Sequence, residues 1–150
     1  MINSANNVKR IAAIDYGNKN IGVAISDASL TVATPLVTIN HKNWLADVLA
    51  LRKFVEPYNV GLIVLGEPLN EDSTDSKQTI DTRLFGQQLE KQGFRVAYCD
   101  ERYTSIEARE TLREKYSDPN EIKQRLDQTA AAIILQRYLD QQLNNNAKER

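Results

Sequence analysis

The chain has 150 residues, of which 41% are hydrophobic and 26% are charged, and its formal net charge at pH 7 is −1. The length fits one domain, residues 1–150, and the composition supplies enough apolar side chains for a core, which excludes disordered and fibrous proteins. The nearly neutral charge excludes a protein that coats nucleic acid through a strongly basic surface.

The chain begins with a polar segment, residues 1–10, which lacks the apolar stretch of a signal peptide. No later run approaches the ~18–20 apolar residues that cross a bilayer, so we expect a cytoplasmic protein with no membrane partner. The ten N-terminal residues carry no strand or helix pattern, and we expect them to be flexible.

Three short extended segments come next and predict an antiparallel meander. Residues 11–14 and 21–25 are apolar runs joined by a turn rich in glycine and asparagine, which is typical of a β-hairpin. The third segment, residues 32–39, contains Pro35. Because proline cannot donate a hydrogen bond to a neighbouring strand, we expect an edge strand or a bulge there.

From residue 43 onward, helices alternate with buried strands. Apolar residues recur at helical spacing over residues 44–55 and 79–91, and a continuous apolar run follows each helix, at 61–65 and at 94–99. The polar residues 70–77 read as a loop. This alternation adds parallel strands to the meander, so the sequence predicts an α/β fold with a mixed sheet and helices on both faces.

Two helices are expected at the end of the chain. Thr104, three residues ahead of Glu107, has the spacing of a capping box and predicts a helix to about residue 116. Asp118 followed by Pro119 is a second start signal, and its helix should run to about Leu143. The polar tail after it, about seven residues, is expected to be frayed.

Three carboxylates are placed where they could share one cleft. Asp15 ends the first strand and Glu101 follows the last one, and sites in open α/β sheets lie beyond the carboxyl ends of the strands. Asp127 falls on the apolar side of the last helix, between Ile134 and Tyr138 in projection, where an unpaired charge is costly. Hard oxygen ligands from three elements suit one or two Mg²⁺ or Mn²⁺ ions.

Other interpretations of these residues stay open on the sequence alone. Asp127 could be neutralised by an arginine, and Asp15 could be an ordinary turn residue. The single histidine, His41, precedes a helix and is expected to be a loop or cap residue. Neither a zinc cluster nor a Gly-x-Ser-x-Gly nucleophile motif is present. Carboxylate-bound metal is therefore the favoured chemistry.

Four ordered segments resemble the motifs of the YqgF family, also called RuvX. They read DYGNKNIGVA at 15–24, LGEPLN at 65–70, DERYTS at 100–105 and LDQTAA at 126–131. Bacterial members of this family are described as Holliday junction resolvases and are implicated in maturing the 5′ end of pre-16S ribosomal RNA. The resemblance covers residues from about 11 to 140. It implies a ribonuclease-H-like fold with Asp15, Glu101 and Asp127 at the catalytic, metal-binding positions.

The same resemblance implies a substrate-side loop that contains Asn70. This chain departs from the family there, because Ser73 and Ser76 stand where glycines are usual. It departs again at Asn20, where a basic residue is common.

Basic side chains near the motifs are candidates for binding substrate phosphates. Lys19 and Arg102 lie within the motifs themselves. Arg109 and Arg113, four residues apart on one predicted helix, could extend the track. The alternative for these two arginines is a solvated helix face on which they pair with neighbouring glutamates.

Together these features predict a metal-dependent endonuclease that hydrolyses phosphodiester bonds in nucleic acid. The resemblance favours 5′-end maturation of pre-16S ribosomal RNA, with ribosomal particles as partners. Cleavage of four-way DNA junctions is the alternative; a homodimer would suit a two-fold junction, and monomer or homodimer stays open. A non-catalytic module that binds nucleic acid or the ribosome is the third candidate. Actin-like ATPases and sugar kinases share the first turn, but 150 residues leave no room for their second lobe.

Overall fold

In the computed structural model of the chain, residues 9–70, 72 and 74–148 are described. The strands are β1 (Arg10–Tyr16), β2 (Asn20–Ser26), β3 (Ala33–Asn40), β4 (Val60–Glu67) and β5 (Val96–Asp100). The helices are α1 (Trp44–Val55), the short 3-10 helix η2 (Glu56–Tyr58), α2 (Lys77–Lys91), α3 (Thr104–Lys115) and α4 (Pro119–Lys148). This order confirms the predicted alternation of strands and helices.

The strands form one mixed sheet in the order β3-β2-β1-β4-β5. The first three strands pair antiparallel, and β4 and β5 continue the sheet parallel to β1. Pro35 lies on the edge strand β3 and beside a register shift opposite Val23 and Ala24. Both features spare proline a ladder hydrogen bond that it cannot donate, as expected from the sequence.

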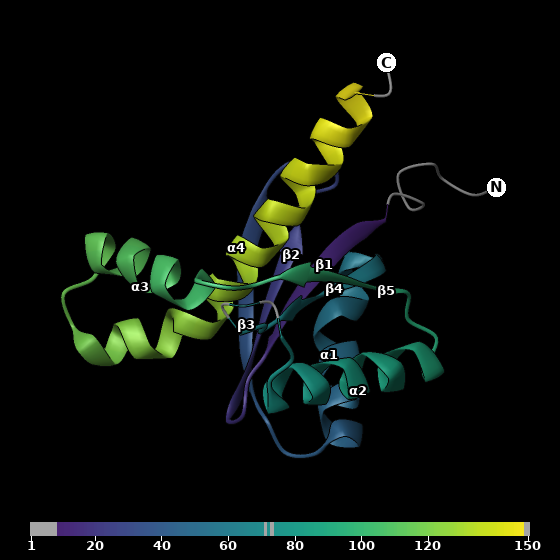
Figure 1. Ribbon diagram of the computed structural model, residues 1–150, viewed down its shortest axis with the longest axis horizontal. Helices are drawn as coiled ribbons and strands as arrows, with labels where there is room; N and C mark the ends of the chain where they lie inside the picture. Colours follow the sequence, from purple (N-terminus) through teal and green to yellow (C-terminus); the bar gives the residue numbers. More distant parts are fainter. Residues whose placement is uncertain (1–8, 71, 73, 149–150) are drawn as a thin grey trace.

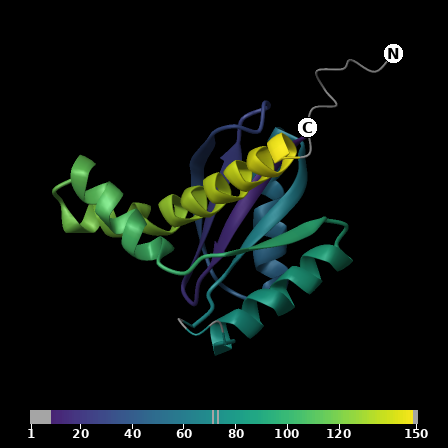
Figure 2. The same ribbon diagram turned by 45° about the horizontal axis from the view of Figure 1, so that its top comes forward.

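Helices cover both faces of the sheet (Figure 1). α4 packs on one face across β1, β2 and β3, whereas α1 and α2 pack on the other face, and α3 packs against α4. Alternate residues of β1 therefore enter different cores, with Ile14 on the α1–α2 side and Ala13 on the α4 side. The hairpin of α3 and the first turns of α4 projects beyond the sheet (Figure 2).

The expected chain ends are partly wrong. The sequence predicts that residues 1–10 are flexible, but Arg10 already belongs to β1. Residues 1–8 lie outside the described residues. At the other end, α4 continues to Lys148, beyond the expected end at Leu143. Residues 144–148 contain no glycine or proline, so nothing in them stops a helix that is already formed. No described helix has the length and apolar character needed to cross a membrane.

The predicted capping box of α3 does not form. Tyr103 is the N-cap residue of this helix, in a left-handed conformation with φ 67°, and no side chain caps the helix. The Thr104 hydroxyl instead accepts a hydrogen bond from Arg137 on α4 at 2.8 Å. The Glu107 carboxylate pairs with the same guanidinium at 2.5 Å. A tertiary partner thus takes both side chains that the local pattern assigned to the cap.

Candidate active site

The carboxyl ends of β1 and β5 bring Asp15 and Glu101 together. Glu101 directly follows β5. Because side chains alternate along a strand, Glu101 faces the same side of the sheet as Cys99, which packs toward α4. The Glu101 carboxyl donates a hydrogen bond to the Asp15 carboxylate. The preceding residue, Asp100, is exposed and pairs with Arg102 at 2.7 Å. Of the two adjacent acidic residues, Glu101 is therefore the one at the site.

Burial and mutual repulsion control the ionisation of this acid pair. Burial is the main reason that the pKa of Asp15 is raised, and the nearby Asp127 carboxylate raises it further. The pKa of Glu101 is raised by burial first and then by the negative charge of Asp15. Because ionising both groups is unfavourable, the pair keeps a shared proton in the neutral range.

Asp127 approaches the pair from α4, and a glycine permits this approach. Gly22 on β2 is the register partner of Asp15. A Cβ atom on Gly22 would lie 2.0 Å from the carbonyl oxygen of Asp127, so the helix backbone rests directly on the strand. Burial raises the pKa of Asp127, while a hydrogen bond with the Asn20 side chain lowers it.

A second glycine lies against Glu101. A Cβ atom on Gly66 of β4 would lie 2.7 Å from Oε2 of Glu101 and 2.6 Å from Cδ1 of Ile134. Sequence reasoning did not identify Gly22 as functional, and the family resemblance implied for Gly66 only a place in the substrate-side loop. The available signal was a glycine inside a strand, which often marks the close approach of another group.

The three carboxylates gather at one end of the sheet without closing around a common point. Asp15 and Glu101 are in contact, and Asp127 acts on Asp15 through its charge. Across residues 9–70, 72 and 74–148, no group of three or more His, Cys, Asp or Glu side chains is spaced to hold a metal ion. The donor chemistry nevertheless fits Mg²⁺ or Mn²⁺, because all three groups offer carboxylate oxygens, the hard ligands that these ions prefer.

A cavity of about 480 Å³ opens on the acid pair. Arg102 lines it, as do Pro68 and Leu69 from the segment after β4. Tyr103 also lines it, with 60% of its surface exposed and its φ in the left-handed region. Such backbone strain in a residue other than glycine is concentrated at functional sites. Tyr103 belongs to the motif at 100–105, but no role was assigned to it from the sequence.

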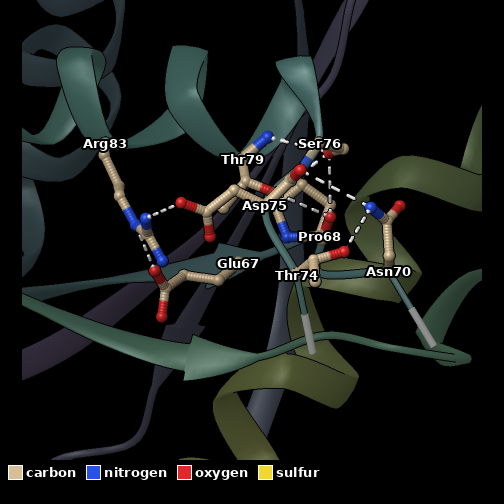
Figure 3. Close-up of polar contacts among 8 residues, drawn as sticks. All are labelled: Glu67, Pro68, Asn70, Thr74, Asp75, Ser76, Thr79 and Arg83. Carbon is tan, nitrogen blue, oxygen red and sulfur yellow. Dashed lines mark hydrogen bonds and ion pairs between the residues drawn. The ribbon is translucent and has the colours of Figure 1, made fainter. Parts of the chain in front are cut away.

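Ion pairs and hydrogen bonds hold the segment between β4 and α2 against the start of α2 (Figure 3). Arg83 on α2 forms ion pairs of 2.7 Å with both Glu67 and Asp75. Ser76 is the N-cap of α2, and its side chain forms a capping box with Thr79. A serine at a position where the family usually has glycine thus acquires a structural role here. Ser73, the other departure, lies outside the described residues.

Asn70, the predicted substrate contact, has its side chain turned into this loop. Its Nδ2 atom donates to the Thr74 hydroxyl at 3.0 Å and to the carbonyl oxygen of Asp75 at 3.5 Å (Figure 3). Its amide nitrogen therefore helps to hold the loop, and its substrate role stays a prediction.

The predicted basic contacts lie on two sides of the acid pair. Lys19 is exposed at the tip of the β1–β2 turn. Arg109 and Arg113 line a cavity of about 710 Å³ between α3 and α4, which also reaches Asp127. Neither arginine is ion-paired within the part of the chain that the structure describes, so the alternative pairing with neighbouring glutamates does not form. Lys123 lines the same cavity, and its position four residues before Asp127 on α4 could have identified it.

Comparisons with known proteins agree with this architecture. The family model for RuvX, Holliday junction resolvase, matches residues 9–141. A relative from Nitrosospira multiformis named "Putative pre-16S rRNA nuclease" is 40% identical over 130 residues, which is 86% of each chain. A relative with the same name from Caldanaerobacter subterraneus is 38% identical over 138 residues, which is 91% of this chain and 99% of that protein.

Solved structures share the fold at low sequence identity. The fowlpox virus resolvase in complex with Holliday junction DNA has a TM-score of 0.54 at 14% identity, covering 89% of this chain and 99% of that one. The RuvC protein of Thermus thermophilus with a junction substrate has a TM-score of 0.53 at 12% identity, covering 90% and 96%. These neighbours confirm the predicted ribonuclease-H-like fold. By the extent of the family match and the identity of its relatives, the chain belongs to the RuvX family of nucleases, hydrolases that act on phosphodiester bonds.

Proposed function

We propose that this nuclease is a divalent-metal-dependent endonuclease whose reaction takes place at Asp15, Glu101 and Asp127. The observation that carries the proposal is the contact between the partly buried carboxyl groups of Asp15 and Glu101 at the end of the sheet, with Asp127 beside them. Adjacent carboxyl groups that are partly withdrawn from water oppose folding, so their presence beside a third points to a function that requires them. Gly22 and Gly66 leave the space that this arrangement needs.

One or two Mg²⁺ or Mn²⁺ ions held by these residues would supply a bound water of lowered pKa and neutralise charge on the scissile phosphate. The protein's own contribution is positioning. Arg102, already oriented by its ion pair with Asp100, lines the cavity where a phosphate would enter. Glu101 holds the proton of the acid pair, and a cation bound by the two carboxylates would replace that proton.

We infer that the nucleic-acid strand reaches the carboxylates along the groove between α3 and α4. Arg109, Arg113 and Lys123 line this groove, and among the described residues Asp127 is its single acidic lining residue. A row of cations that ends at the site suits a polyanionic backbone, because phosphate contacts position a strand without reading its bases.

The names of the relatives favour pre-16S ribosomal RNA as the substrate. We propose that cleavage matures its 5′ end in the cytoplasm, with a ribosomal precursor particle as partner. The family description supports a second candidate, resolution of four-way DNA junctions by a homodimer. A module that binds nucleic acid without cleaving it is the third candidate.

Cleavage of two substrates side by side tests these candidates. Purified protein is incubated with a pre-16S ribosomal RNA fragment or a four-way DNA junction, with Mn²⁺ or with EDTA. We expect Mn²⁺-dependent cuts at the 5′ boundary of the RNA. The Asp15→Asn variant, purified identically, controls for a contaminating nuclease. Symmetrical cuts in the junction alone would favour resolution. Tight binding of either substrate without Asp15-dependent cleavage would overturn the endonuclease proposal.

A further inference from the structure

We propose that a second cavity, on the other side of the β1–β2 turn from the acid pair, binds an unpaired nucleobase next to the cleaved bond. This inference rests on the proposed nuclease function and specifies its substrate as one with unpaired nucleotides at the site. The cavity measures about 480 Å³ and lies where the end of β1 meets α1 and α2. Its aromatic and apolar lining residues are Tyr16, His41, Trp44, Leu84 and Phe85.

Packed rings form the floor of this base cavity. Tyr16 and Phe85 are buried and stack on each other, with ring centroids 4.1 Å apart and planes 12° apart. The His41 ring meets Tyr16 edge-on at 5.2 Å. The buried carboxylate of Asp47 fixes this ring, since its Oδ2 lies 2.6 Å from Nδ1 of His41. The floor is therefore rigid before any ligand binds.

The sides of the base cavity expose apolar surface. Trp44, the first residue of α1, is 45% exposed, and Leu84 on α2 is 52% exposed. A planar ring inserted between them would cover surface that is otherwise in water, and base–aromatic stacking is a main source of affinity for single strands.

The charges around the base cavity select against a phosphate. Its lining, all within the described residues, contains no lysine or arginine, and Asp81 contributes a negative charge. An anionic group would therefore be repelled, whereas a neutral ring would not. The side chains of Asn18, Gln78 and Gln88 add amide donors and acceptors of the kind that pair with the edge of a base.

The base cavity adjoins the acidic cavity. Tyr16, Gly17, Asn18 and Gln78 line both. Gln78 donates a hydrogen bond to the carbonyl oxygen of Tyr16, which holds the ridge between the two cavities in place. A strand that crosses this ridge can place a phosphate at the carboxylates and a neighbouring base among the rings. A base outside a duplex can enter such a cavity at the least cost, because a paired base must first be unpaired and unstacked.

Fluorescence provides a direct test, because Trp44 is the only tryptophan of the chain. The Asp15→Asn variant, which should leave the substrate intact, is titrated with a nine-nucleotide single-stranded RNA, with the same strand carrying a central abasic run, and with ribose 5-phosphate. We expect saturable quenching of Trp44 by the complete strand and little by the other two probes. Equal quenching by the abasic strand, or no response to any probe, would overturn the base site.

Matched variants in the active enzyme provide a second test. Trp44→Ala and Leu84→Ala should each raise KM about tenfold with little change in kcat, as removal of one stacking contact predicts, and Trp44→Phe should restore most of the loss. Leu49→Ala on α1 and Ile80→Ala on α2 remove similarly exposed side chains that do not line the cavity, and KM should stay unchanged.

The two proposals fail separately. If the enzyme is active and the Trp44 and Leu84 variants leave KM unchanged, the base site alone is overturned. The same holds if these variants change the oligomeric state and not KM. Base-dependent quenching of a protein that cleaves nothing would support the base site and overturn the endonuclease proposal alone.

Discussion

Asp15 is a residue at which stability and activity are expected to oppose each other. Its carboxylate is held against Glu101, and both pKa values are raised mainly by burial. Asp15→Asn removes one of the repelling charges and supplies an amide that can donate a hydrogen bond to Glu101. We expect the variant, in EDTA, to unfold about 2–4 °C higher than the wild type, equivalent to ~1 kcal/mol. It should also lose cleavage and the stabilisation by Mn²⁺, as thermal unfolding with and without the ion will show.

Asp140→Asn is the matched control for this prediction. Asp140 is an exposed residue of α4, and its Oδ1 accepts a hydrogen bond from Gln136 that an asparagine can also accept. Its substitution should change neither thermal stability nor the response to Mn²⁺. In EDTA, Asp15→Asn could instead unfold at a lower temperature than the wild type while Asp140→Asn did not. The acid pair would then be a source of stability, and the argument from repulsion would be wrong.

The same residues predict how stability depends on pH. Unfolded carboxyl groups lose their protons near pH 4, whereas burial keeps a proton on the Asp15–Glu101 pair at higher pH. Between these limits the folded state binds more protons than the unfolded state, so the contribution of the pair to stability falls as pH rises. In EDTA, the difference in unfolding temperature between Asp15→Asn and the wild type should therefore be small near pH 4 and grow toward pH 8. A difference that shrinks with rising pH would contradict the raised pKa values.

At the scale of elements, the position of α4 against β2 depends on Gly22. Gly22→Ala would place a methyl group 2.0 Å from the backbone oxygen of Asp127, and a backbone atom cannot rotate away as a side chain can. We expect α4 to shift outward, which would move Asp127 away from Asp15. The free energy of unfolding should fall by about 1–3 kcal/mol. Cleavage should fall at least tenfold, and the stabilisation by Mn²⁺ should be lost.

Ile25→Ala distinguishes this positional effect from simple destabilisation. Ile25 lies on the same strand but faces the α1–α2 core, away from α4. Its truncation should lower stability by about 2–5 kcal/mol through a cavity. The folded fraction should still cleave and respond to Mn²⁺. Equal losses of the Mn²⁺ response in both variants would show that Gly22 has no specific role in positioning Asp127.

The sequence predicted strands and helices where the residue pattern that forms them lies within one segment of the chain. Periodicity identified the strands and helices, and helical projection placed Asp127 on the inner side of α4. The choice of Glu101 over Asp100 came from the family resemblance. The acid pair's hydrogen bond and the contact at Gly22 could not be predicted, because they depend on how separate elements pack.

The start of α3 shows the same limit. Thr104 and Glu107 have the spacing of a capping box, yet both bind Arg137, which is 30 or more residues away in the sequence. The base cavity escaped prediction for a related reason, because Trp44 and Leu84 lie on two separate helices and entered the sequence analysis only as parts of two helical segments.

At the scale of the whole molecule, the net charge of −1 cannot attract nucleic acid by itself. The affinity must therefore depend on where the positive charges lie. Arg113 and Lys123 line the α3–α4 groove that ends at Asp127, whereas α1 lies on the opposite face of the sheet. Each phosphate contact releases counterions, so the logarithm of the binding constant falls with the logarithm of salt concentration by ~0.7 per contact for a single strand.

We therefore expect Arg113→Gln and Lys123→Gln each to weaken binding of a single-stranded RNA and to reduce this salt slope by about 0.7, measured by fluorescence anisotropy in the Asp15→Asn background. Lys53→Gln, which removes an exposed cation on α1, is the matched control and should leave the slope unchanged. Because all three substitutions change the net charge equally, a slope that fell by the same amount in each would show that the overall charge, and not the groove, sets the affinity. A reduction confined to Arg113 and Lys123 would trace the strand from the α3–α4 groove to the carboxylates.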